Sequence, residues 1–403
     1  MAILAKKQRR HVLVVNSGSS SLKLSIFEKS GRALNRRMDA HVNGIGAPGA
    51  TLHVTTQIGT FDDLFEEPLT KDEILARIFG KMGIEIALIG HRYVHGGAHF
   101  VSPVRITPEV ISQLQSLSQL APLHNDVCLD WILACRHFFG IGVPQVATFD
   151  TAFYGDLPDV ASHYAIPAPL TKKYHIRRYG FHGLSHAFLL DTYRKRLAPG
   201  KKVAALITVH LGNGCSITAI KGSLPIDTSM GFTPAEGLVM ATRAGDIDAG
   251  LVEFLCTHER ASPEKTVQLL NTQSGLLGVS QLAARMEILL DHYDTNAQAK
   301  LAVDLFCYRA LKYIGSYAAA LGGVDAIIFS GGIGENAPAI RKRIIDPLKW
   351  LGITLDTGCN RKAVGLPLGA SQKISHARSS VDVYVVATDE NLYIAKAACQ
   401  EVF

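Results

Sequence analysis

The chain has 403 residues, of which 47% are hydrophobic, so it is long enough for two or three domains with sizeable cores. The formal net charge of +6 is small for this length, which fits a protein that handles small anions and excludes the basic surface of a nucleic-acid-binding protein. The sequence lacks an apolar run of the roughly 18 residues that a membrane helix needs. Its basic start, MAILAKKQRRH, lacks the apolar stretch of a signal peptide, so we expect a solvated extension. Seven scattered cysteines without a CxxC pair indicate free thiols in a reducing cytoplasm.

Apolar runs alternate with helical patterns along both halves of the chain. In the first half we expect strands at 11–16, 21–28, 50–58, 87–97 and 144–153 and helices at 73–83 and 129–140. In the second half the order recurs, with strands at 203–212, 214–222, 223–229, 324–332 and 381–390 and helices at 249–258, 297–321, 337–346 and 391–400. Strands mixed with crossover helices predict the α/β class. The repeat places a domain boundary near residue 151, although no linker separates the halves.

A polar turn between two buried strands occurs twice, in VLVVNSGSSSLKLSI and in LITVHLGNGCSITAI. When the two segments are overlaid, Asn16 meets His210 and Gly18 meets Gly212. Glycine lets the backbone approach a ligand closely, successive backbone N–H groups bind phosphate oxygens, and Lys23 adds a positive charge. One such turn is more often an ordinary hairpin. Two turns in the same strand context favour a duplicated anion site.

Further loops contain groups suited to phosphate, carboxylate or metal chemistry. Arg92 in HRYVHGG and Arg243 in TRAGDID offer guanidinium forks that match carboxylate and phosphoryl oxygens, although a lone loop arginine is more often in a surface ion pair. Asp150 ends an apolar strand in TFDTAF, where a buried carboxylate needs a partner or a metal. In SGGIGENAPAIR we expect a glycine-rich turn and a helix that starts at Asn336. The turn ATDENLYIA offers Glu390 as an oxygen ligand for Mg²⁺.

Other patterns point less clearly to a ligand. The segment GIGAPG (44–49) matches GxGxxG but lacks the strand–turn–helix setting of a dinucleotide site, and the chain has no GxxxxGK[ST]. His91, His95 and His99 are spaced by four like zinc ligands on a helix. Gly96 and Gly97 would break such a helix, so we expect no zinc site there.

Taken together, these motifs resemble those of the acetate kinases, which belong to the acetate and sugar kinase/Hsp70/actin superfamily. The motifs occur in the family's order from Val12 to about Ala398: VNSGSSSLK, HRYVHGG, APLHN, FDTAF, RRYGFHGLSH, HLGNG, GFTPAEGL, TRAGDID, GGIGEN and TDENLYIA. The resemblance implies an α/β fold of two duplicated actin-like (ribonuclease H-like) domains with an active-site cleft between them. The N-terminal domain would comprise residues 1–151 and a returning helix in 387–403. The C-terminal domain, residues 152–386, would bind the nucleotide and form a dimer interface.

By position, the resemblance also implies a role for each candidate residue. The catalytic residues would surround the transferred phosphoryl group, a small apolar pocket would hold the acyl methyl group, and two loops would bind ATP or ADP. The implied residues are Arg92, Asp150, His182 and Arg243 for catalysis; Arg92, Val94, Leu123, Phe181 and Pro234 for the substrate; Lys23, His210, Leu211, Gly212, Asn213, Gly214, Gly332, Ile333, Gly334, Glu335 and Asn336 for the nucleotide; and Asn16 and Glu390 for Mg²⁺, with Mn²⁺ as the alternative metal.

The implied activity is a Mg²⁺-dependent, reversible transfer of the γ-phosphoryl group of ATP to the carboxylate of acetate, which gives acetyl phosphate and ADP. The attacking carboxylate is ionised near pH 7, so the protein must offset the repulsion between two anions rather than remove a proton. The implied partners are acetate or another short carboxylate and ATP. The protein would be a cytoplasmic homodimer that binds neither nucleic acid nor membrane.

Three departures from the family pattern leave alternatives open. Residues 126–128 read Asp-Val-Cys where the family has Pro-Pro-Asn, TRAGDIDA lacks a serine and a proline, and residues 281–285 lack an Asp-x-Arg-Asp element that contacts adenosine. A propionate or butyrate kinase, or a kinase with a donor other than ATP, stays an alternative, because one methylene in an apolar pocket is worth only about 1–3 kcal/mol. A catalytically silent nucleotide sensor is the other alternative, but it would be expected to lose catalytic residues that this chain keeps.

Overall fold

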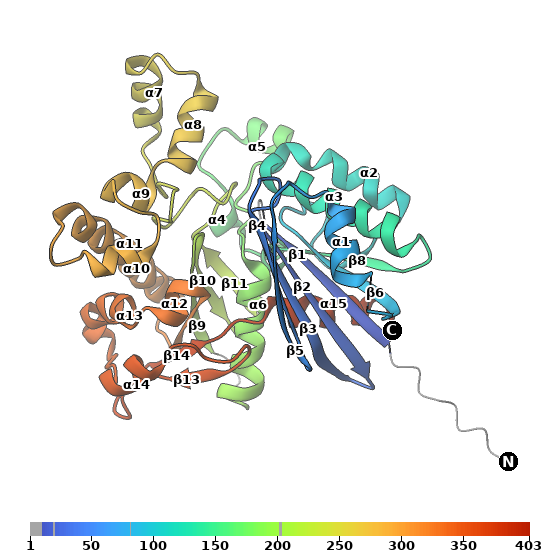
Figure 1. The fold of residues 1–403 in the computed structure, drawn as a ribbon. Helices are drawn as coiled ribbons and strands as arrows, with labels where there is room; N and C mark the ends of the chain where they lie inside the picture. Colours follow the sequence, from blue (N-terminus) through green and yellow to red (C-terminus); the bar gives the residue numbers. More distant parts are fainter. Residues whose placement is uncertain (1–9, 19–20, 81, 201–203) are drawn as a thin grey trace. The chain divides into compact units, whose positions relative to one another are not determined.

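The computed structural model describes residues 10–18, 21–80, 82–200 and 204–403, and the side chains at positions 122 and 123 lie outside this description. The basic extension expected at residues 1–9 also lies outside it. The chain divides into two compact units (Figure 1). The first unit comprises residues 1–153 and 390–403, and the second comprises residues 154–389.

An eight-stranded sheet forms the centre of the first unit, in the order β5-β4-β3-β2-β1-β6-β8-β7. Strands β1 to β5 form an antiparallel meander, and β6 and β8 add in parallel beside β1. The strands are β1 (Arg10–Ser17), β2 (Ser21–Ser30), β3 (Ala33–Asn43), β4 (Ala50–Thr56), β5 (Gly59–Phe65), β6 (Ile86–Tyr93), β7 (Val104–Arg105) and β8 (Gln145–Phe149).

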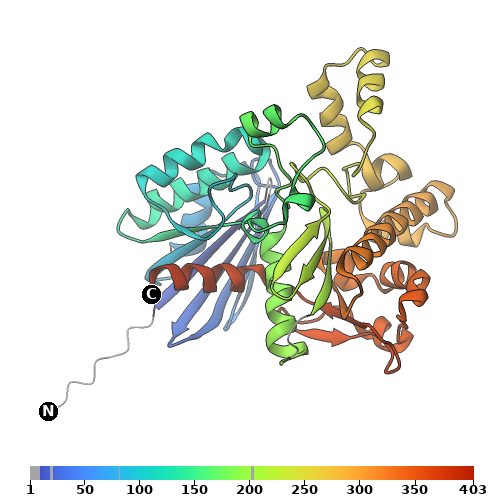
Figure 2. The ribbon, with the colours of Figure 1, turned by 180° about the vertical axis from the view of Figure 1, so that it is seen from behind.

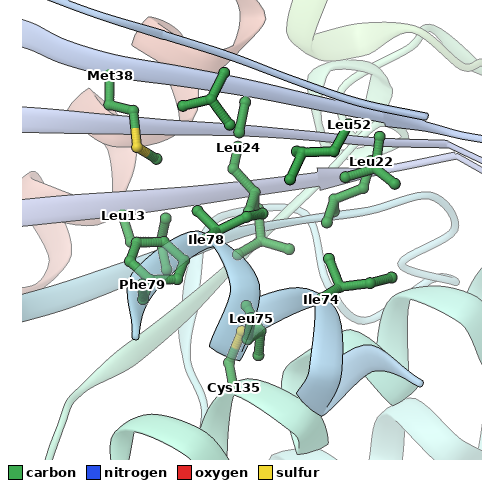
Figure 3. Packing of buried hydrophobic residues seen from close by; sticks show 14 of the residues in the cluster. Leu13, Leu22, Leu24, Met38, Leu52, Ile74, Leu75, Ile78, Phe79 and Cys135 are labelled. Carbon is green, nitrogen blue, oxygen red and sulfur yellow. The ribbon is translucent and has the colours of Figure 1, made fainter. Parts of the chain in front are cut away.

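Helices cover both faces of this sheet. On one face, α1 (Lys71–Phe79) and α3 (Pro122–Phe139) bury an apolar cluster with β1 to β4, and α2 (Pro108–Ser116) packs against α3 (Figure 3). On the other face, α15 (Glu390–Val402) lies along β1 and β6 (Figures 1 and 2). Gly90 permits this close packing, because a Cβ at Gly90 would lie 2.9 Å from Cγ2 of Ile394.

The second unit has a six-stranded sheet in the order β11-β10-β9-β12-β14-β13. Helix α6 packs on β9, and α11 packs on β9 and β10; Figure 2 shows this sheet between the two helices. The strands are β9 (Ala205–Leu211), β10 (Cys215–Lys221), β11 (Leu224–Thr228), β12 (Ala326–Ser330), β13 (Ser371–Lys373) and β14 (Asp382–Val386). The helices are α4 (Asp159–Ser162), α5 (Ala168–Tyr174), α6 (Gly183–Thr192), α7 (Ala249–His258), α8 (Pro263–Thr272), α9 (Gly275–Ser280), α10 (Met286–Asp291), α11 (Ala297–Leu321), α12 (Gly331–Asn336), α13 (Pro338–Ile345) and α14 (Thr357–Lys362).

The two sheets share one arrangement. In each sheet three consecutive strands form an antiparallel meander. Two later strands then continue the sheet in parallel beside the first strand of that meander, which is β1 in one sheet and β9 in the other. The matching orders are β3-β2-β1-β6-β8 and β11-β10-β9-β12-β14. The predicted α/β class and the predicted repeat are therefore confirmed.

Some local predictions differ from the structure. The predicted helix start at Asn336 is wrong: the glycine-rich turn is itself the short helix α12, and the next helix begins at Pro338. Ala337 separates the two helices with φ −113° and ψ 82°, because a residue before proline avoids the helical region. The GIGAPG segment (44–49) forms turns between β3 and β4. Within the described residues, no helix combines the length and hydropathy needed to cross a membrane.

Candidate active site

The two polar turns occupy equivalent positions in the two sheets. Asn16 is the penultimate residue of β1 and His210 is the penultimate residue of β9. Gly18 and Gly212 follow the ends of these strands; the N–H of Gly18 donates to the carbonyl of Ser21 at 2.8 Å, and the N–H of Gly212 donates to the carbonyl of Gly214 at 3.0 Å. Lys23 lies directly opposite Asn16 on β2, with an exposed side chain. The overlay of the two sequence segments therefore matches two structurally equivalent hairpins.

A buried ion pair lies at the ends of β6 and β8 in the first unit. Arg92 donates from Nε to Oδ1 of Asp150 at 3.0 Å and from Nη2 to Oδ2 at 2.6 Å. Asp150 is almost fully buried, with a side chain 2% exposed, whereas the side chain of Arg92 is 19% exposed. Burial of Arg92 disfavours its charge, but the charge and hydrogen bonds of Asp150 outweigh burial and raise the pKa of Arg92. The guanidinium therefore stays charged at every physiological pH.

The start of α15 brings further polar groups to this pair. Asn16 donates from Nδ2 to Oε2 of Glu390 at 3.1 Å and to Oδ1 of Asn391 at 3.1 Å. Nη1 of Arg92 lies 3.5 Å from Oδ1 of Asn16. Asn391 in turn donates from Nδ2 to Oγ of Ser25 at 2.7 Å. The first unit thus holds four of the predicted residues, Asn16, Arg92, Asp150 and Glu390, in one hydrogen-bonded cluster.

The donor set of this cluster fits a divalent cation that is shared with phosphate. Glu390 supplies a carboxylate and Asn16 an amide oxygen. Mg²⁺ in proteins is commonly held by one or two carboxylates together with substrate phosphates and waters. Among the described residues no group of three or more His, Cys, Asp and Glu forms a ready metal cage.

The residues predicted for the acyl pocket belong to both units. Val94 directly follows β6 and is buried, and the side chain of Leu123 lies outside the described residues. Phe181 is buried, and its carbonyl accepts a hydrogen bond from the hydroxyl of Tyr154 at 3.0 Å. Pro234 is half-buried in the second unit.

In the second unit, a histidine and an arginine converge on a glycine of the predicted phosphate loop. A Cβ built on Gly214 would lie 3.1 Å from Nε2 of His182 and 3.6 Å from Nη1 of Arg243. The same Nη1 donates to the carbonyl of Pro234 at 3.1 Å. Burial lowers the pKa of Arg243, while Cys215 opposes this shift. Only a residue without a side chain leaves the two basic groups this close to the loop backbone.

His182 itself has an unusual backbone conformation. It precedes α6 with φ 55°, in the left-handed region that few residues other than glycine adopt. Its ring lies 4.6 Å from the ring of His210, measured between centroids. Nδ1 of His210 is held by Oγ of Ser185 at 2.8 Å. The two histidines therefore lie side by side next to the predicted phosphate loop.

The glycine-rich helix α12 lies against the end of β9. Gly331 has φ 76°, and a Cβ there would lie 2.6 Å from the carbonyl of Leu211. A Cβ on Gly212 would lie 3.9 Å from the N atom of Gly332. The carboxylate of Glu335 points inward and accepts from the N–H of Gly331 at 2.9 Å. The predicted nucleotide residues at the end of β9 and in α12 are thus neighbours. The carboxylate of Glu335 fixes the start of α12 through its hydrogen bond to Gly331.

A fully buried arginine donates hydrogen bonds to the carbonyls at the end of α12. Arg341 on α13 donates from Nη1 to the carbonyls of Gly334 and Glu335, each at 2.8 Å. Its remaining nitrogens donate to Asn360 and to the carbonyl of Ala363. Burial lowers the pKa of Arg341 to about 10, so it remains charged at neutral pH. This guanidinium satisfies carbonyls at the end of a helix that would otherwise lack partners.

Sequence reasoning missed several of these contributors. Asn391 has a local signal, since it follows Glu390 in the first turn of a helix. Ser216 could be found from the β9–β10 pairing, which places it opposite His210. His186 lies four residues after His182; its N–H donates to the carbonyl of His182 at 3.1 Å, and its Nε2 lies 2.8 Å from Oγ of Ser216. The contacts of Arg341 depend on tertiary packing, so no local pattern reveals them.

The three histidines at zinc-like spacing, His91, His95 and His99, lie in separate surroundings. His91 lies on β6 and its Nε2 is 2.7 Å from Oε1 of Gln145, while Nδ1 of His95 accepts from the N–H of Gly97 at 3.0 Å. His99 is exposed. As expected from the two glycines, this segment does not form one helix that could bring the three rings together.

Comparisons with known proteins agree along nearly the whole chain. A family model described as the Acetokinase family matches residues 11–396. An acetate kinase from Solibacter usitatus (strain Ellin6076) is 42% identical over 407 residues, covering 96% of this chain and 97% of that protein. An acetate kinase from Thermoanaerobacterium thermosaccharolyticum is 42% identical over 397 residues, with coverage of 96% and 97%.

Solved structures give the same result for the fold. The crystal structure of Porphyromonas gingivalis acetate kinase matches with a TM-score of 0.88 at 36% identity, covering 98% of this chain and 100% of that one. A propionate kinase from Francisella tularensis subsp. tularensis SCHU S4 matches with a TM-score of 0.89 at 35% identity and the same coverage.

Proposed function

The chain belongs to the acetokinase family, and from this premise we propose that it transfers the γ-phosphoryl group of ATP to the carboxylate of acetate, reversibly, with acetyl phosphate and ADP as products. The observation that supports this proposal best is the convergence of His182 and Arg243 on Gly214. Two basic side chains beside a backbone-lined loop are suited to hold phosphoryl oxygens as negative charge builds up on them.

In the proposed mechanism the first unit binds the carboxylate. The guanidinium of Arg92 has five N–H donors. Nε and Nη2 donate to Asp150, and the contacts of Nη1 to Oδ1 of Asn16 and to the carbonyl of Ser17 are long, at 3.5 and 3.4 Å. The second N–H of Nη2 and the weakly held Nη1 can therefore donate to a second carboxylate. Asp150 orients Arg92 and does not remove a proton, since the substrate carboxylate is already ionised. Val94, Phe181, Pro234 and Leu123 would surround the methyl group.

The second unit would bind the nucleotide and stabilise the transferred group. We assign the loop 210–214, which includes His210, and the turn 332–336 to the nucleotide, together with Lys23 of the first unit. His182 and Arg243 would donate to the phosphoryl oxygens in the transition state. Family membership implies a divalent metal, and we propose Mg²⁺, with Asn16 and Glu390 as the residues that hold it. When bound, the metal would supply charge neutralisation at the phosphates.

Two parts of this proposal concern the whole molecule. We propose that both units contribute to one active site, in a cleft formed by the domains predicted at 1–151 with 387–403 and at 152–386. We also propose a cytoplasmic homodimer. The seven free thiols are consistent with a reducing compartment, and exposed apolar side chains on α7 and α8 are consistent with a partner surface.

Propionate is the second candidate substrate. The propionate kinase from Francisella tularensis and the acetate kinase from Porphyromonas gingivalis match this chain about equally well. Because one methylene changes binding by only about 1–3 kcal/mol, the pocket residues do not decide between the two acids. Butyrate, and a phosphoryl donor other than ATP, are outcomes of the same test.

Trapping of acyl phosphate as hydroxamate tests the proposal. The purified protein with Mg²⁺ is assayed with acetate, propionate and butyrate, each combined with ATP, GTP and pyrophosphate. We expect the highest kcat/KM with acetate and ATP. If a folded preparation gives no hydroxamate with any pair, the chain is not an acyl kinase, and the silent nucleotide-binding sensor becomes the better account. A higher value with propionate would reassign the substrate.

A further inference from the structure

A line of side-chain hydrogen bonds runs through the second unit and ends at His182. Oγ1 of Thr208 lies 2.7 Å from Nδ1 of His186, and Nε2 of His186 lies 2.8 Å from Oγ of Ser216. The same Oγ of Ser216 lies 2.9 Å from Nδ1 of His182. Thr208, His186 and Ser216 are fully buried, with no exposed surface. Each hydroxyl in this line has one proton, so the positions of the protons are coupled.

The bond at the buried end of the line sets the direction of the donors that we infer. In that direction Oγ1 of Thr208 donates to the carbonyl of Thr218 at 3.4 Å and accepts from Nδ1–H of His186 at 2.7 Å. Burial, assisted by the nearby His210, lowers the pKa of His186 well below its usual value. A neutral imidazole has a single N–H, so Nε2 of His186 accepts the proton of Ser216. The oxygen of Ser216 then accepts from Nδ1–H of His182.

This order of donors has a consequence for the far side of the His182 ring. Its Cε1–Nε2 edge lies against Gly214, the position next to Arg243 in the predicted phosphate loop. If Nδ1 holds the proton of neutral His182, Nε2 has none to give. Nε2 can then donate to a phosphoryl oxygen only when the ring is an imidazolium ion.

We propose that Ser216 and His186 are positioning residues that keep a proton on Nδ1 of His182, so that His182 acts on the phosphoryl group as an imidazolium ion. This inference rests on the proposed function. It adds two residues and a protonation state that family membership does not specify. The bond to Ser216 also fixes the ring plane of a residue whose backbone is already in the left-handed region.

The charges around His182 predict when it becomes protonated. The described groups near it within the second unit include Arg243, His210 and, through Ser216, His186, with the thiol of Cys215 beside Arg243. Arg243 opposes a second positive charge, whereas nucleotide phosphates favour it. We therefore expect binding of ADP or ATP to be coupled to proton uptake. The active form is lost as pH rises above the pKa of His182 in the nucleotide complex.

The decisive measurement is the protonation state of His182 by NMR of ¹⁵N-histidine-labelled protein, with the resonances assigned through His182→Gln. We expect the neutral ring of the free protein to have its proton on Nδ1, and the ring to become an imidazolium ion on addition of ADP and Mg²⁺ at the same pH. A neutral ring with its proton on Nε2, or a ring that stays neutral in the nucleotide complex, would overturn the proposal.

A matched pair of variants tests the positioning role. Ser216→Ala removes the acceptor for Nδ1–H, so neutral His182 can place its proton on Nε2. We expect kcat to fall by about 10- to 100-fold, as for residues that orient a catalytic imidazole, with a weaker decline at high pH. Ser185→Ala removes the hydroxyl that holds His210 instead, and the His182 tautomer should not change. An unchanged His182 tautomer in Ser216→Ala would refute the role of Ser216.

These outcomes are separable from failure of the proposed function. The tautomer of His182 in the free protein and its response to ADP need no turnover. If hydroxamate assays fail while NMR shows the expected states, the activity is wrong and the hydrogen-bond line stands. If hydroxamate forms while His182 stays neutral with nucleotide bound, the activity stands and this inference falls.

Discussion

At the scale of single residues, the charged groups of the candidate site differ in how they are compensated. Arg92 is paired with the carboxylate of Asp150, whereas Arg243 donates to the carbonyl of Pro234 and to Sδ of Met240, and burial lowers its pKa. A buried cation with so little compensation is poised to gain free energy when a phosphoryl anion arrives. The two arginines therefore suit different tasks, Arg92 the binding of a carboxylate and Arg243 the stabilisation of a transition state.

The first prediction concerns Arg243. Replacing Arg243 with alanine should lower kcat by at least about 100-fold with little change in ATP affinity, because the lost donor acts mainly in the transition state. Steady-state kinetics of acetyl phosphate formation, with direct measurement of ATP binding by calorimetry, checks this. Near-normal turnover in Arg243→Ala would rule out the assigned role.

The second prediction concerns the ion pair of Arg92 and Asp150. Arg92→Met leaves an uncompensated carboxylate that is almost fully buried, and should lower the free energy of unfolding by about 3–5 kcal/mol. Asp150→Leu should cost less, because the side chain of Arg92 reaches water. The double variant should be more stable than Arg92→Met alone. Urea unfolding of the four proteins gives the cycle, and strictly additive effects would show that the pair is not coupled.

The sequence identifies most residues of the candidate site and misses the groups that orient them. Arg92, Asp150 and His182 stand in motifs that local chemistry makes conspicuous. The bond from Asn391 to Ser25 joins residues 366 positions apart, and the partners of Arg341 follow from packing of α13. Such contacts depend on which elements become neighbours, and local composition does not determine that.

At the scale of elements, apolar strands were predictable and polar strands were not. β1, β9 and β12 are nearly continuous apolar runs, because both faces of these central strands are buried. β3, by contrast, alternates between buried positions such as Met38 and more exposed ones such as Asp39. Its polar face obscures the signal of a strand. The turn at Gly331 was misread because a helix of glycines has no propensity to reveal it.

The third prediction concerns the turn of α12. Arg341→Met removes the donors to the carbonyls of Gly334 and Glu335, so the turn should lose its fixed geometry. We expect KM for ATP to rise by about tenfold or more, corresponding to at least about 1.4 kcal/mol, while KM for the carboxylate changes little. Arg343→Met is the matched control, because Arg343 lies on the same helix, is exposed and stacks on Tyr293. Equal effects of the two variants would show that loss of charge, and not loss of the turn, is responsible.

At the scale of the whole molecule, each unit contains a histidine that burial keeps neutral. His91 in the first unit has a pKa lowered to about 4 by burial, against the bond to Gln145 that would raise it. Its Nδ1 is buried without a hydrogen-bond partner among the described residues. In the second unit, burial and then His210 lower the pKa of His186.

The fourth prediction follows for acid stability. In the unfolded chain each of these histidines binds a proton as pH falls through about 6.5, whereas in the native state it stays neutral. The free energy of unfolding therefore falls as pH drops below about 6.5. For His91 it continues to fall until about pH 4. By pH 5, His91 alone should lower the free energy of unfolding by about 2 kcal/mol. His91→Gln should show that much less acid destabilisation in urea unfolding at pH 7 and pH 5. The exposed His99→Gln serves as control, and an equal pH response in all three proteins contradicts the prediction.

The fifth prediction concerns self-association. On α7 and α8, the side chains of Leu251, Phe254, Val267 and Leu269 are each more than two fifths exposed. Because α7 and α8 pack against each other, these side chains offer candidate contacts for a partner subunit. We expect a dimer in analytical ultracentrifugation, and Phe254→Glu should shift it toward monomer. Leu301→Glu on α11, at a similarly exposed position, should not. A monomeric wild-type protein at micromolar concentration would contradict the proposal.

The return of the chain to the first unit also constrains the order in which the protein can be completed during synthesis. The sheet of the first unit is translated early, but α15, which covers Gly90 and supplies Glu390 and Asn391 to Asn16, is translated after the whole second unit. At about 5–20 residues per second, this interval lasts roughly 10 to 50 s. During that interval the face of β1 and β6 lacks its cover, and Asn16 lacks its partners. A chain that ends before α15 therefore lacks Glu390 and Asn391 and leaves the apolar face of β1 and β6 uncovered.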